Sequence, residues 1–317
     1  MHSKNNKKTI LITGASGFIG NALYARLNNE NYNIIGLDNF FRGKNLKNQT
    51  IIKGSIFDKK ILKKLIRKSD IIIHLVAING TRNFYNIPDK VFEVSIRGAM
   101  ILYDCLNEIG DKNKKILLAS SGEVYGEPKK IPTDEKVSLV VKDIFNNRYS
   151  YGGGKICQDL IARYLISKVV KQCIIFRPHN VYGPNMGFDH VIPELMIKSL
   201  KAKNKITIEG SGKETRSFCY IDDFINGLII LIKKKISGFN IFNIGNDREI
   251  SINNLTKLII KNSKKNLLIK NKKLRTGSSK RRCPDIKKIK RLGYKPIVSL
   301  ETGIEKMKIY DYTLSKL

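Results

Sequence analysis

A tyrosine and a lysine, Tyr151 and Lys155, stand four residues apart with three glycines between them. Glycine inside a helix is about 1 kcal/mol less favourable than alanine, so local rules favour a loop here. If a helix instead begins near Tyr149 or Ser150, the phenol and the ammonium lie on one face. An adjacent cation typically lowers the pKa of a phenol by about 1–3 units, which would make Tyr151 a general base. Apolar residues at near-helical spacing follow the pair, at Ile156, Leu160, Ile161, Tyr164 and Leu165.

A glycine-rich turn follows the first apolar run of the chain. Residues 8–14 have the composition of a short buried strand, and residues 13–20 read TGASGFIG. Glycines at this spacing allow a tight bend, close approach of the backbone to a pyrophosphate, and close packing of the next helix on the sheet. The pattern therefore predicts a dinucleotide site. Its cofactor contacts are Gly14, Gly17, Phe18, Ile19 and Gly20.

Asp38 stands at the end of the second expected strand, 33–37. A carboxylate there accepts hydrogen bonds from ribose hydroxyls and repels a 2′-phosphate. We therefore expect NAD rather than NADP as the cofactor. Arg42 is a mild signal in the opposite direction, because a guanidinium can hold that phosphate.

The composition is that of an ordinary globular chain. It has 317 residues, of which 42% are hydrophobic. No apolar run approaches the roughly 18–20 residues needed to cross a membrane. The first apolar run is too short for a signal peptide, so we expect a cytoplasmic protein. The five cysteines are scattered and lack Cys-x-x-Cys spacing, which suggests neither a disulfide framework nor a metal site.

The formal net charge of +32 raises the question of a nucleic-acid partner. The lysines, however, are spread over the whole length, together with many asparagines and isoleucines. Clusters such as 59–68 fit the solvated side of an amphipathic helix. We therefore expect no nucleic-acid partner, although the charge would attract small polyanionic substrates.

Strands and helices alternate over the first half of the chain. The run 70–76 is almost continuously apolar, as in a parallel strand covered on both faces. This alternation predicts an α/β fold with a doubly wound parallel sheet, a Rossmann fold. We expect a cofactor domain over 1–177, to which 221–243 return, and a smaller mixed α/β substrate domain over 178–220 and 244–317.

Further motifs occur in an order that is hard to produce by chance. They are HLVA at 74–77, SSGEVYG at 120–126, RPHNVYGP at 177–184, ETRSFCYIDD at 214–223 and RRCPD at 281–285. Together with TGASGFIG and the Tyr151–Lys155 pair, they resemble the extended short-chain dehydrogenases/reductases of the nucleotide-sugar epimerase and dehydratase family. The resemblance covers nearly the whole chain. It implies an NAD-dependent enzyme that acts on a nucleotide-diphosphate sugar.

The resemblance implies roles for individual residues. Ser121 would hydrogen-bond the sugar hydroxyl that is oxidised, Tyr151 would remove its proton, and Lys155 would hold the nicotinamide ribose. Asp58 resembles the acidic residue near the adenine, although it is also placed to cap a helix. By the same resemblance, Ala77 in the HLVA motif would contact the cofactor.

On the substrate side, the resemblance assigns Asn180 to the substrate's phosphates. It assigns Arg216 and Arg282 to the diphosphate, whose charge suits bidentate guanidinium groups. Neither the sugar nor the base can be read from these motifs. Candidates for the sugar pocket are His179, Arg82 and Asn79.

Two positions depart from the family pattern. Ser95 stands where the family usually has asparagine, for which we expect a changed local contact rather than lost activity. Gly122 stands where the dehydratases carry the aspartate that assists loss of the C6 hydroxyl. Glu123 is retained; in dehydratases and decarboxylases this position does chemistry, whereas in epimerases it can be structural.

The leading interpretation is epimerisation at C4 through a transient 4-keto intermediate. The alternatives are a nucleotide-sugar decarboxylase or 4,6-dehydratase that uses Glu123, and a non-catalytic RNA-associated protein of the same fold. The resemblance also implies a homodimer in which helices 88–107 and 150–168 pack between subunits. Residues that could supply this interface are Val91, Val94, Leu102, Leu160 and Leu165, although the same residues could equally cover the sheet of a monomer.

The glycine run 152–154 remains unusual for a helix. Three glycines would be tolerated where something approaches closely, and the candidates are the cofactor, the substrate or a partner subunit. On this interpretation, a bulky residue at Gly153 should damage catalysis or cofactor fit more than folding.

Overall fold

The centre of the computed structural model, which describes residues 7–43, 50–274, 277 and 279–308, is a seven-stranded sheet. All neighbouring strands pair in parallel, in the order β11-β6-β5-β4-β1-β2-β3. The order reverses at β1, as in a doubly wound fold, and the predicted fold class is confirmed. The strands are β1 (Thr9–Thr13), β2 (Asn33–Asp38), β3 (Ile51–Lys53), β4 (Ile71–His74), β5 (Lys115–Ala119), β6 (Gln172–Pro178) and β11 (Gly238–Ile244).

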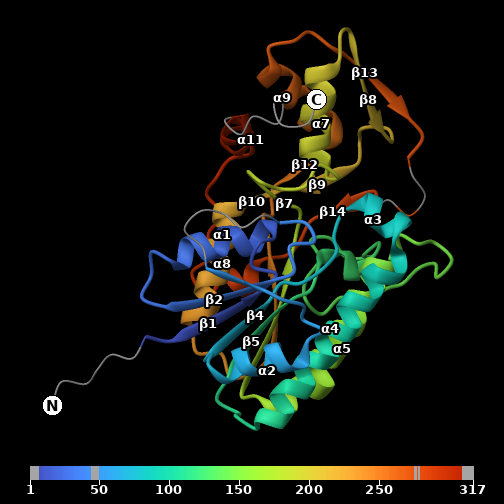
Figure 1. Cartoon of the computed structure of the whole chain (residues 1–317). Helices are drawn as coiled ribbons and strands as arrows, with labels where there is room; N and C mark the ends of the chain where they lie inside the picture. Colours follow the sequence, from blue (N-terminus) through green and yellow to red (C-terminus); the bar gives the residue numbers. More distant parts are fainter. Residues whose placement is uncertain (1–6, 44–49, 275–276, 278, 309–317) are drawn as a thin grey trace.

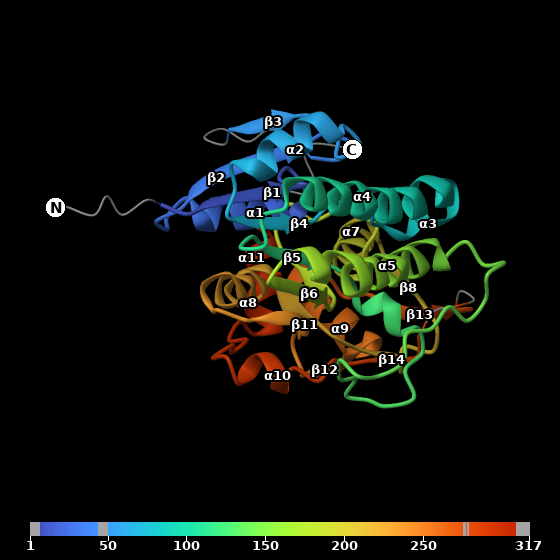
Figure 2. The ribbon, with the colours of Figure 1, turned by 90° about the horizontal axis from the view of Figure 1, so that it is seen from below.

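Helices cover both faces of this sheet, because its strands are apolar on both sides. Ile10 and Ile12 of β1 belong to one hydrophobic core, whereas Leu11 between them belongs to the other. The first core includes α1 (Phe18–Leu27) and α8 (Ile221–Lys233), and the second includes residues of α2, α4 and the segment after α5. Figure 2 shows these layers with the sheet seen between them. The helices of the second face are α2 (Lys59–Arg67), α4 (Pro88–Ile109) and α5 (Tyr149–Ile161).

A smaller part of the chain lies at the upper end of the sheet in Figure 1. It holds α7 (Val191–Lys201) and α9 (Ile252–Ser263), which pack together, and two small sheets. One pairs β8 (Lys205–Glu209) with β13 (Leu268–Lys272) in parallel. The other joins β9 (Thr215–Ser217) to β12 (Glu249–Ser251) and β14 (Arg281–Arg282). The division of the chain into two domains remains a proposal.

The remaining elements are short or lie at junctions. Among the described residues, no helix is long and apolar enough to cross a membrane. The last helix of the described residues is α11 (Leu300–Lys308). Two elements near the site had no sequence signal, α3 (Thr81–Asn86) and the 3₁₀ turn η1 (Gly122–Tyr125). The other elements are the π-helical turn η2 (Ala162–Ile166), α6 (Ser167–Val169), β7 (Val181–Tyr182), β10 (Cys219–Tyr220) and α10 (Lys287–Lys290).

Candidate active site

The glycine turn between β1 and α1 has the geometry that a pyrophosphate needs. Gly14 has φ +75°, a conformation that residues with side chains rarely adopt. A Cβ on Gly20 would stand 2.1 Å from the carbonyl oxygen of Gly14, so α1 packs directly on the turn. Gly17 caps α1 without a side-chain hydrogen bond, which leaves the first N–H groups of this helix for a ligand. Phe18 and Ile19 form the first turn of α1, as predicted.

Asp38 lies at the end of β2, beside the glycine turn. Its Oδ2 accepts a hydrogen bond from the Ser16 N–H at 2.9 Å, and its Oδ1 accepts one from the Phe40 N–H at 2.7 Å. The carboxylate therefore fixes the turn while retaining acceptor capacity. Arg42 donates to the carbonyl oxygen of Asn79 at 2.5 Å and lies against Gly187. Because its guanidinium is occupied there, Arg42 adds little to an argument for NADP.

Asp58 and Ala77, the two further residues predicted to contact the cofactor, follow β3 and β4 in the chain. Asp58 caps α2, since its Oδ1 accepts a hydrogen bond from the Ile61 N–H at 3.0 Å. The capping function alone accounts for this residue, and its adenine contact stays a prediction. Ala77 follows β4 and packs against the small core that contains Phe84 and Tyr151.

The predicted helix start is confirmed, since α5 begins at Tyr149. Each glycine of the run 152–154 faces a different part of the same chain. A Cβ on Gly152 would lie 3.3 Å from the carbonyl oxygen of Glu123, and one on Gly154 would lie 3.1 Å from the Cβ of Ser95. A Cβ on Gly153 would make ordinary contacts with a methyl group of Val141, at 3.5 Å, and with the ring of Phe92, at 3.8 Å. The expectation that cofactor, substrate or a partner approaches these glycines stays a prediction, but contacts within the chain already account for Gly152 and Gly154.

Tyr151 is buried, with its ring stacked on that of Phe84 at 4.9 Å between centroids. Burial raises the pKa of the Tyr151 phenol to about 12, while a side-chain hydrogen bond with Ser121 acts in the opposite direction. The structure thus joins Ser121 and Tyr151, as predicted. The expected lowering of the Tyr151 pKa by Lys155 is not observed.

Lys155 does not lower the pKa of Tyr151 because its ammonium is bound to other groups. Its Nζ donates to the carbonyl oxygen of Ala119 at 2.7 Å and to Oε1 of Gln158 at 2.8 Å. Burial lowers the pKa of Lys155 to about 8, and the Asp159 carboxylate partly offsets this. Lys155 therefore ties α5 to the end of β5, from which the Ser121 turn follows.

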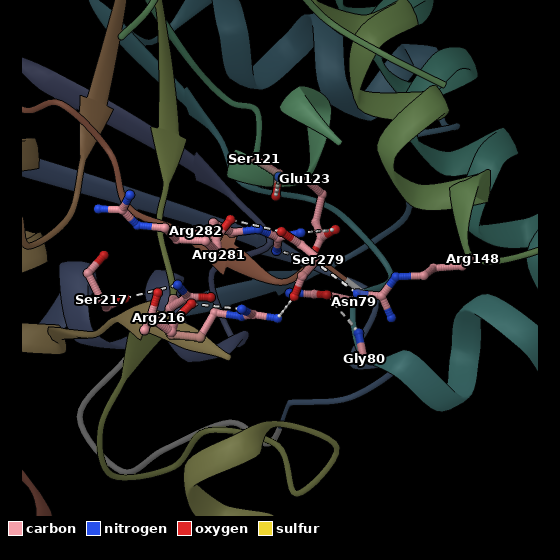
Figure 3. Close-up of polar contacts among 12 residues, drawn as sticks. Asn79, Gly80, Ser121, Glu123, Arg148, Arg216, Ser217, Ser279, Arg281 and Arg282 are labelled. Carbon is pink, nitrogen blue, oxygen red and sulfur yellow. Dashed lines mark hydrogen bonds and ion pairs between the residues drawn. The ribbon is translucent and has the colours of Figure 1, made fainter. Parts of the chain in front are cut away.

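A cavity of about 700 Å³ opens beyond the carboxyl ends of β5 and β6. Glu123, Arg148 and Arg282 meet on its wall, as Figure 3 shows. Arg282 holds both carboxylate oxygens of Glu123, at 2.5 and 3.1 Å, and Arg148 lies 3.8 Å away. Burial of the Glu123 carboxyl would raise its pKa, but the charges of Arg282 and Arg148 outweigh this and lower it to about 2. Glu123 is therefore a carboxylate at neutral pH.

Asn180 and Arg216 line the same cavity, as expected of substrate contacts. Asn180 has φ +41°, and its side chain donates to the carbonyl oxygen of Ser217 at 2.9 Å. Arg216 donates to backbone carbonyl oxygens, including that of Ser279 at 2.5 Å. Burial lowers the pKa of the Arg216 guanidinium to about 10, and the Arg282 charge acts in the same direction. Two cations held this close together form a site suited to an anion.

Sequence reasoning missed two residues of this site and misplaced others. Phe84, which stacks on Tyr151, lies on the unpredicted helix α3, and Arg148 has no motif of its own. The position of Arg148 one helical turn before Tyr151 was the only available signal. Arg82 lines the cavity as expected. The cavity lining does not include Asn79 or His179, and His179 is buried behind η1 instead.

Residues 10–245 match the model of the NAD dependent epimerase/dehydratase family. The match includes the glycine turn, Ser121, Tyr151 and Lys155. The chain belongs to this family. As a member of the NAD dependent epimerase/dehydratase family it is an NAD-dependent enzyme of nucleotide-sugar metabolism, so the interpretation as a non-catalytic protein is wrong.

Family members with three different reactions are similar to the chain. A UDP-glucuronic acid decarboxylase of Xenopus tropicalis is 29% identical over 310 residues, which are 96% of this chain and 72% of that protein. A dTDP-D-glucose 4,6-dehydratase of Dictyostelium discoideum is 33% identical over 280 residues, which are 81% of this chain and 63% of that protein. The structure of a UDP-glucose 4-epimerase from Thermotoga maritima, solved with UDP-glucose, is 27% identical with a TM-score of 0.82 and covers 95% of this chain and 98% of its own.

Proposed function

We propose that the chain epimerises a nucleotide-diphosphate sugar at C4 through a transient 4-keto intermediate. NAD, held by the glycine turn and Asp38, would supply reversible hydride transfer. Tyr151 would take the proton of the sugar hydroxyl and return it, while Ser121 orients that hydroxyl. Asn180, Arg216 and Arg282 are the groups we propose for the diphosphate.

The main support for this proposal is the chemistry of the two residues that follow Ser121, Gly122 and Glu123. Gly122 has no side chain, and Glu123 is a carboxylate held at both oxygens by Arg282. Loss of water from a keto sugar needs a group that protonates the leaving hydroxyl. A carboxyl group with a pKa near 2 is almost never protonated at neutral pH. The wall therefore favours return of the hydride over elimination.

Decarboxylation is the second candidate, and one feature of the site favours it. A sugar acid oxidised at C4 is a β-keto acid, which loses carbon dioxide without protonation by the protein. Arg148 lies beside Glu123 on the cavity wall and is one more cation than a diphosphate held by Arg216 and Arg282 requires. The similar Xenopus tropicalis protein is a UDP-glucuronic acid decarboxylase. The two candidates thus differ in whether C6 of the substrate is a hydroxymethyl group or a carboxylate.

Product mass distinguishes the candidates. The purified protein with NAD would be incubated with UDP-, GDP-, dTDP- and CDP-linked hexoses and with UDP-glucuronic acid. We expect a product of unchanged mass whose proton NMR spectrum shows inversion at C4. A product lighter by carbon dioxide would overturn the epimerase in favour of the decarboxylase, and one lighter by water would overturn both.

A catalytic control belongs in the same assay. Tyr151→Phe keeps the stacked ring but removes the hydroxyl, so turnover should fall by about 10²–10⁴-fold with little change in stability. Unaltered turnover in Tyr151→Phe would contradict the proposed mechanism even if the product is the expected one. Deuterated solvent adds a further distinction, because exchange at C5 would require a base on the wall.

We also propose a homodimer through the outer face of α4 and α5. Val91 and Leu102 are fully buried within one chain, which favours the alternative that they pack in the interior of the monomer. Phe92, Leu160 and Tyr164 are exposed apolar residues on this face. Light scattering at micromolar concentration should give twice the monomer mass, and Leu160→Lys should reduce it toward the monomer.

A further inference from the structure

The 3₁₀ turn η1 meets a buried histidine ring where one of its residues has no side chain. Gly122 follows Ser121 and precedes Glu123, which stands on the cavity wall (Figure 3). A Cβ added at Gly122 would lie 2.7 Å from both Cε1 and Nδ1 of His179. Real Cβ atoms essentially never approach heavy atoms so closely. A side chain at position 122 is therefore compatible with the fold only if His179 moves.

His179 has little freedom to move. Its Nε2 lies 3.1 Å from Oδ1 of Asn243, and its ring stacks against that of Tyr125. Asn243 is itself fixed, because its Oδ1 accepts a hydrogen bond from the Tyr125 hydroxyl at 2.8 Å and its Nδ2 donates to the carbonyl oxygen of Thr133 at 3.0 Å. At the base of the side chain, a Cβ added at Gly245 would stand 2.8 Å from the Cβ of His179. The imidazole ring of His179 is therefore fixed by contacts on several sides.

The hydrogen bond to Asn243 also settles which nitrogen carries the proton. An amide oxygen accepts, so the proton is on Nε2 and Nδ1 is left as an acceptor. Within the described part of the chain, Nδ1 of His179 has no hydrogen-bond partner. It faces the bare backbone of Gly122. His179 therefore fills the space beside η1 without offering a proton to the site.

We propose that His179 is a positioning and specificity-determining residue for the reaction of this enzyme. Its ring supports η1 and so fixes the Ser121 hydroxyl against Tyr151 and the Glu123 carboxylate against Arg282. By occupying the space beside Gly122, it also keeps an acidic side chain out of the position that precedes Glu123. The effect on reaction outcome rests on the proposed C4 oxidation, whereas the support of η1 does not.

The consequence for chemistry is a block on loss of water. Elimination from a 4-keto hexose removes the C5 proton and the C6 hydroxyl, and an acid must protonate that hydroxyl as it leaves. With Glu123 ionised and position 122 bare, neither wall residue can do so. Return of the hydride then remains the open route for a substrate with a C6 hydroxyl.

The first test is a double-mutant cycle on thermal unfolding of the full chain, with the variants Gly122→Ala, His179→Ala and both together. We expect Gly122→Ala to lower the Tm by about 3–10 °C, because overpacking forces a rigid neighbour to shift. In the His179→Ala background the same change should have less than half this effect. Additive shifts would overturn the proposal, because they would mean that the two residues do not share this space.

Gly153→Ala supplies the matched control. It adds the same methyl group at a glycine where the new Cβ would make only ordinary contacts, with Val141 at 3.5 Å and Phe92 at 3.8 Å. It should show no coupling to His179→Ala. If Gly153→Ala were coupled as strongly as Gly122→Ala, the coupling would reflect a general loss of stability, and the proposed contact would be wrong.

The second test is catalytic and separates positioning from stability. Below their unfolding temperatures, Gly122→Ala should lower kcat by about 10-fold or more with little change in KM, whereas in the His179→Ala background, whose own kcat is lower than that of the wild type, the same substitution should lower kcat much less. An equal loss of kcat in both backgrounds would contradict positioning. If the wild-type chain converts no sugar, the proposed function fails, while the thermal cycle still decides whether His179 supports η1.

The third test concerns reaction outcome. Gly122→Asp combined with His179→Ser makes room for a carboxyl group beside Glu123. We expect this double variant to release a product 18 Da lighter from a nucleotide hexose, above the level of His179→Ser alone. A folded double variant that still oxidises its substrate but forms no such product would overturn the specificity part of the proposal.

Discussion

The glycine turn and the charged cavity wall are suited to bind anions by different means. In the turn, we expect the backbone of Gly14, Gly17 and the first residues of α1 to face the pyrophosphate, and the structure leaves no room for a Cβ on Gly20. On the wall, Arg216 and Arg282 present guanidinium groups that are already engaged with protein acceptors. Binding in the turn thus depends on close approach of a ligand to the backbone. Binding on the wall depends on the balance between its cationic and anionic side chains.

This difference determines how each region tolerates change. A backbone site has one geometry, so a single added methyl group blocks it. A wall of charged side chains is less constrained, since Arg282 holds Glu123 through its terminal nitrogens and has an Nε–H without a partner among the described residues for a phosphate. We therefore expect substitutions in the turn to act on folding and cofactor binding together, and substitutions on the wall to act on substrate affinity.

The largest effect is expected for Gly20→Ala. Its Cβ would stand 2.1 Å from the Gly14 carbonyl oxygen and 2.9 Å from the Cα of Ala15, both backbone atoms. We expect a loss of about 3 kcal/mol or more in unfolding free energy and a loss of NAD binding. Urea unfolding and NAD titration by calorimetry measure both.

Gly153→Ala is the control for Gly20→Ala, because both glycines are helical. Its new Cβ would make ordinary contacts with side chains of Val141 and Phe92, so Gly153→Ala should keep or raise the stability, since alanine favours a helix by about 1 kcal/mol. The earlier expectation that a bulky residue at Gly153 harms cofactor fit would require the opposite order of effects. Equal loss of NAD binding in Gly20→Ala and Gly153→Ala would contradict the close approach in the turn.

The next effect concerns neighbouring arginines on β14. Arg282 holds Glu123 in the cavity, whereas Arg281 holds Glu249 at the exposed surface. Arg282→Met should weaken UDP binding by about 10–100-fold, because a charged hydrogen bond is worth about 1.5–3 kcal/mol. Arg281→Met should change it less than about 3-fold, because exposed ion pairs contribute little. Calorimetry with UDP tests this, and similar losses in both variants would show that Arg282 does not bind the diphosphate.

The contrast between the turn, whose residues are close together in the sequence, and the wall, whose residues are far apart, also explains which features the sequence could predict. The turn was predictable because its residues lie within eight positions of one another, and its glycines, the strand before it and Asp38 after it follow local rules. The start of α5 at Tyr149 was predictable for a similar reason, since the periodic residues after the glycine run outweigh the glycines themselves.

The state of the wall was not predictable, because its contacts join distant parts of the chain. Glu123 and Arg282 are 159 positions apart, and each was assigned a separate task. The direction of Lys155 depends on Gln158 and the Ala119 carbonyl, which no spacing rule connects to Tyr151. His179 is a sequence candidate for the sugar pocket, yet it lies behind η1, because packing against Gly122, Tyr125 and Asn243 places it there.

The smallest effect we predict uses two buried histidines, one beneath each region. His74 lies 2.9 Å from the Thr13 hydroxyl below the glycine turn, and His179 lies behind the cavity wall. Burial lowers the pKa of His74 to about 3, with the Lys155 charge acting in the same direction, and lowers that of His179 to about 4. Both values lie below the ordinary value of 6.5, so the unfolded chain takes up protons first as the pH falls. Their contribution to stability is therefore complete above pH ~6.5 and is lost as the pH falls toward 4 and 3.

Each histidine should account for about 2 kcal/mol of the unfolding free energy lost between pH 8 and pH 5. His74→Gln and His179→Gln should each show a loss smaller by about that amount than the wild type, as measured by urea unfolding at the two pH values. The carboxyl groups that titrate in all three proteins contribute equally to the pH dependence of the unfolding free energy. Their contribution therefore cancels when each variant is compared with the wild type. Ligand binding at pH 8 then separates the regions, because His74→Gln should weaken NAD binding and His179→Gln should lower turnover. A pH dependence equal to that of the wild type in either variant would mean that its histidine is not held neutral beneath the site.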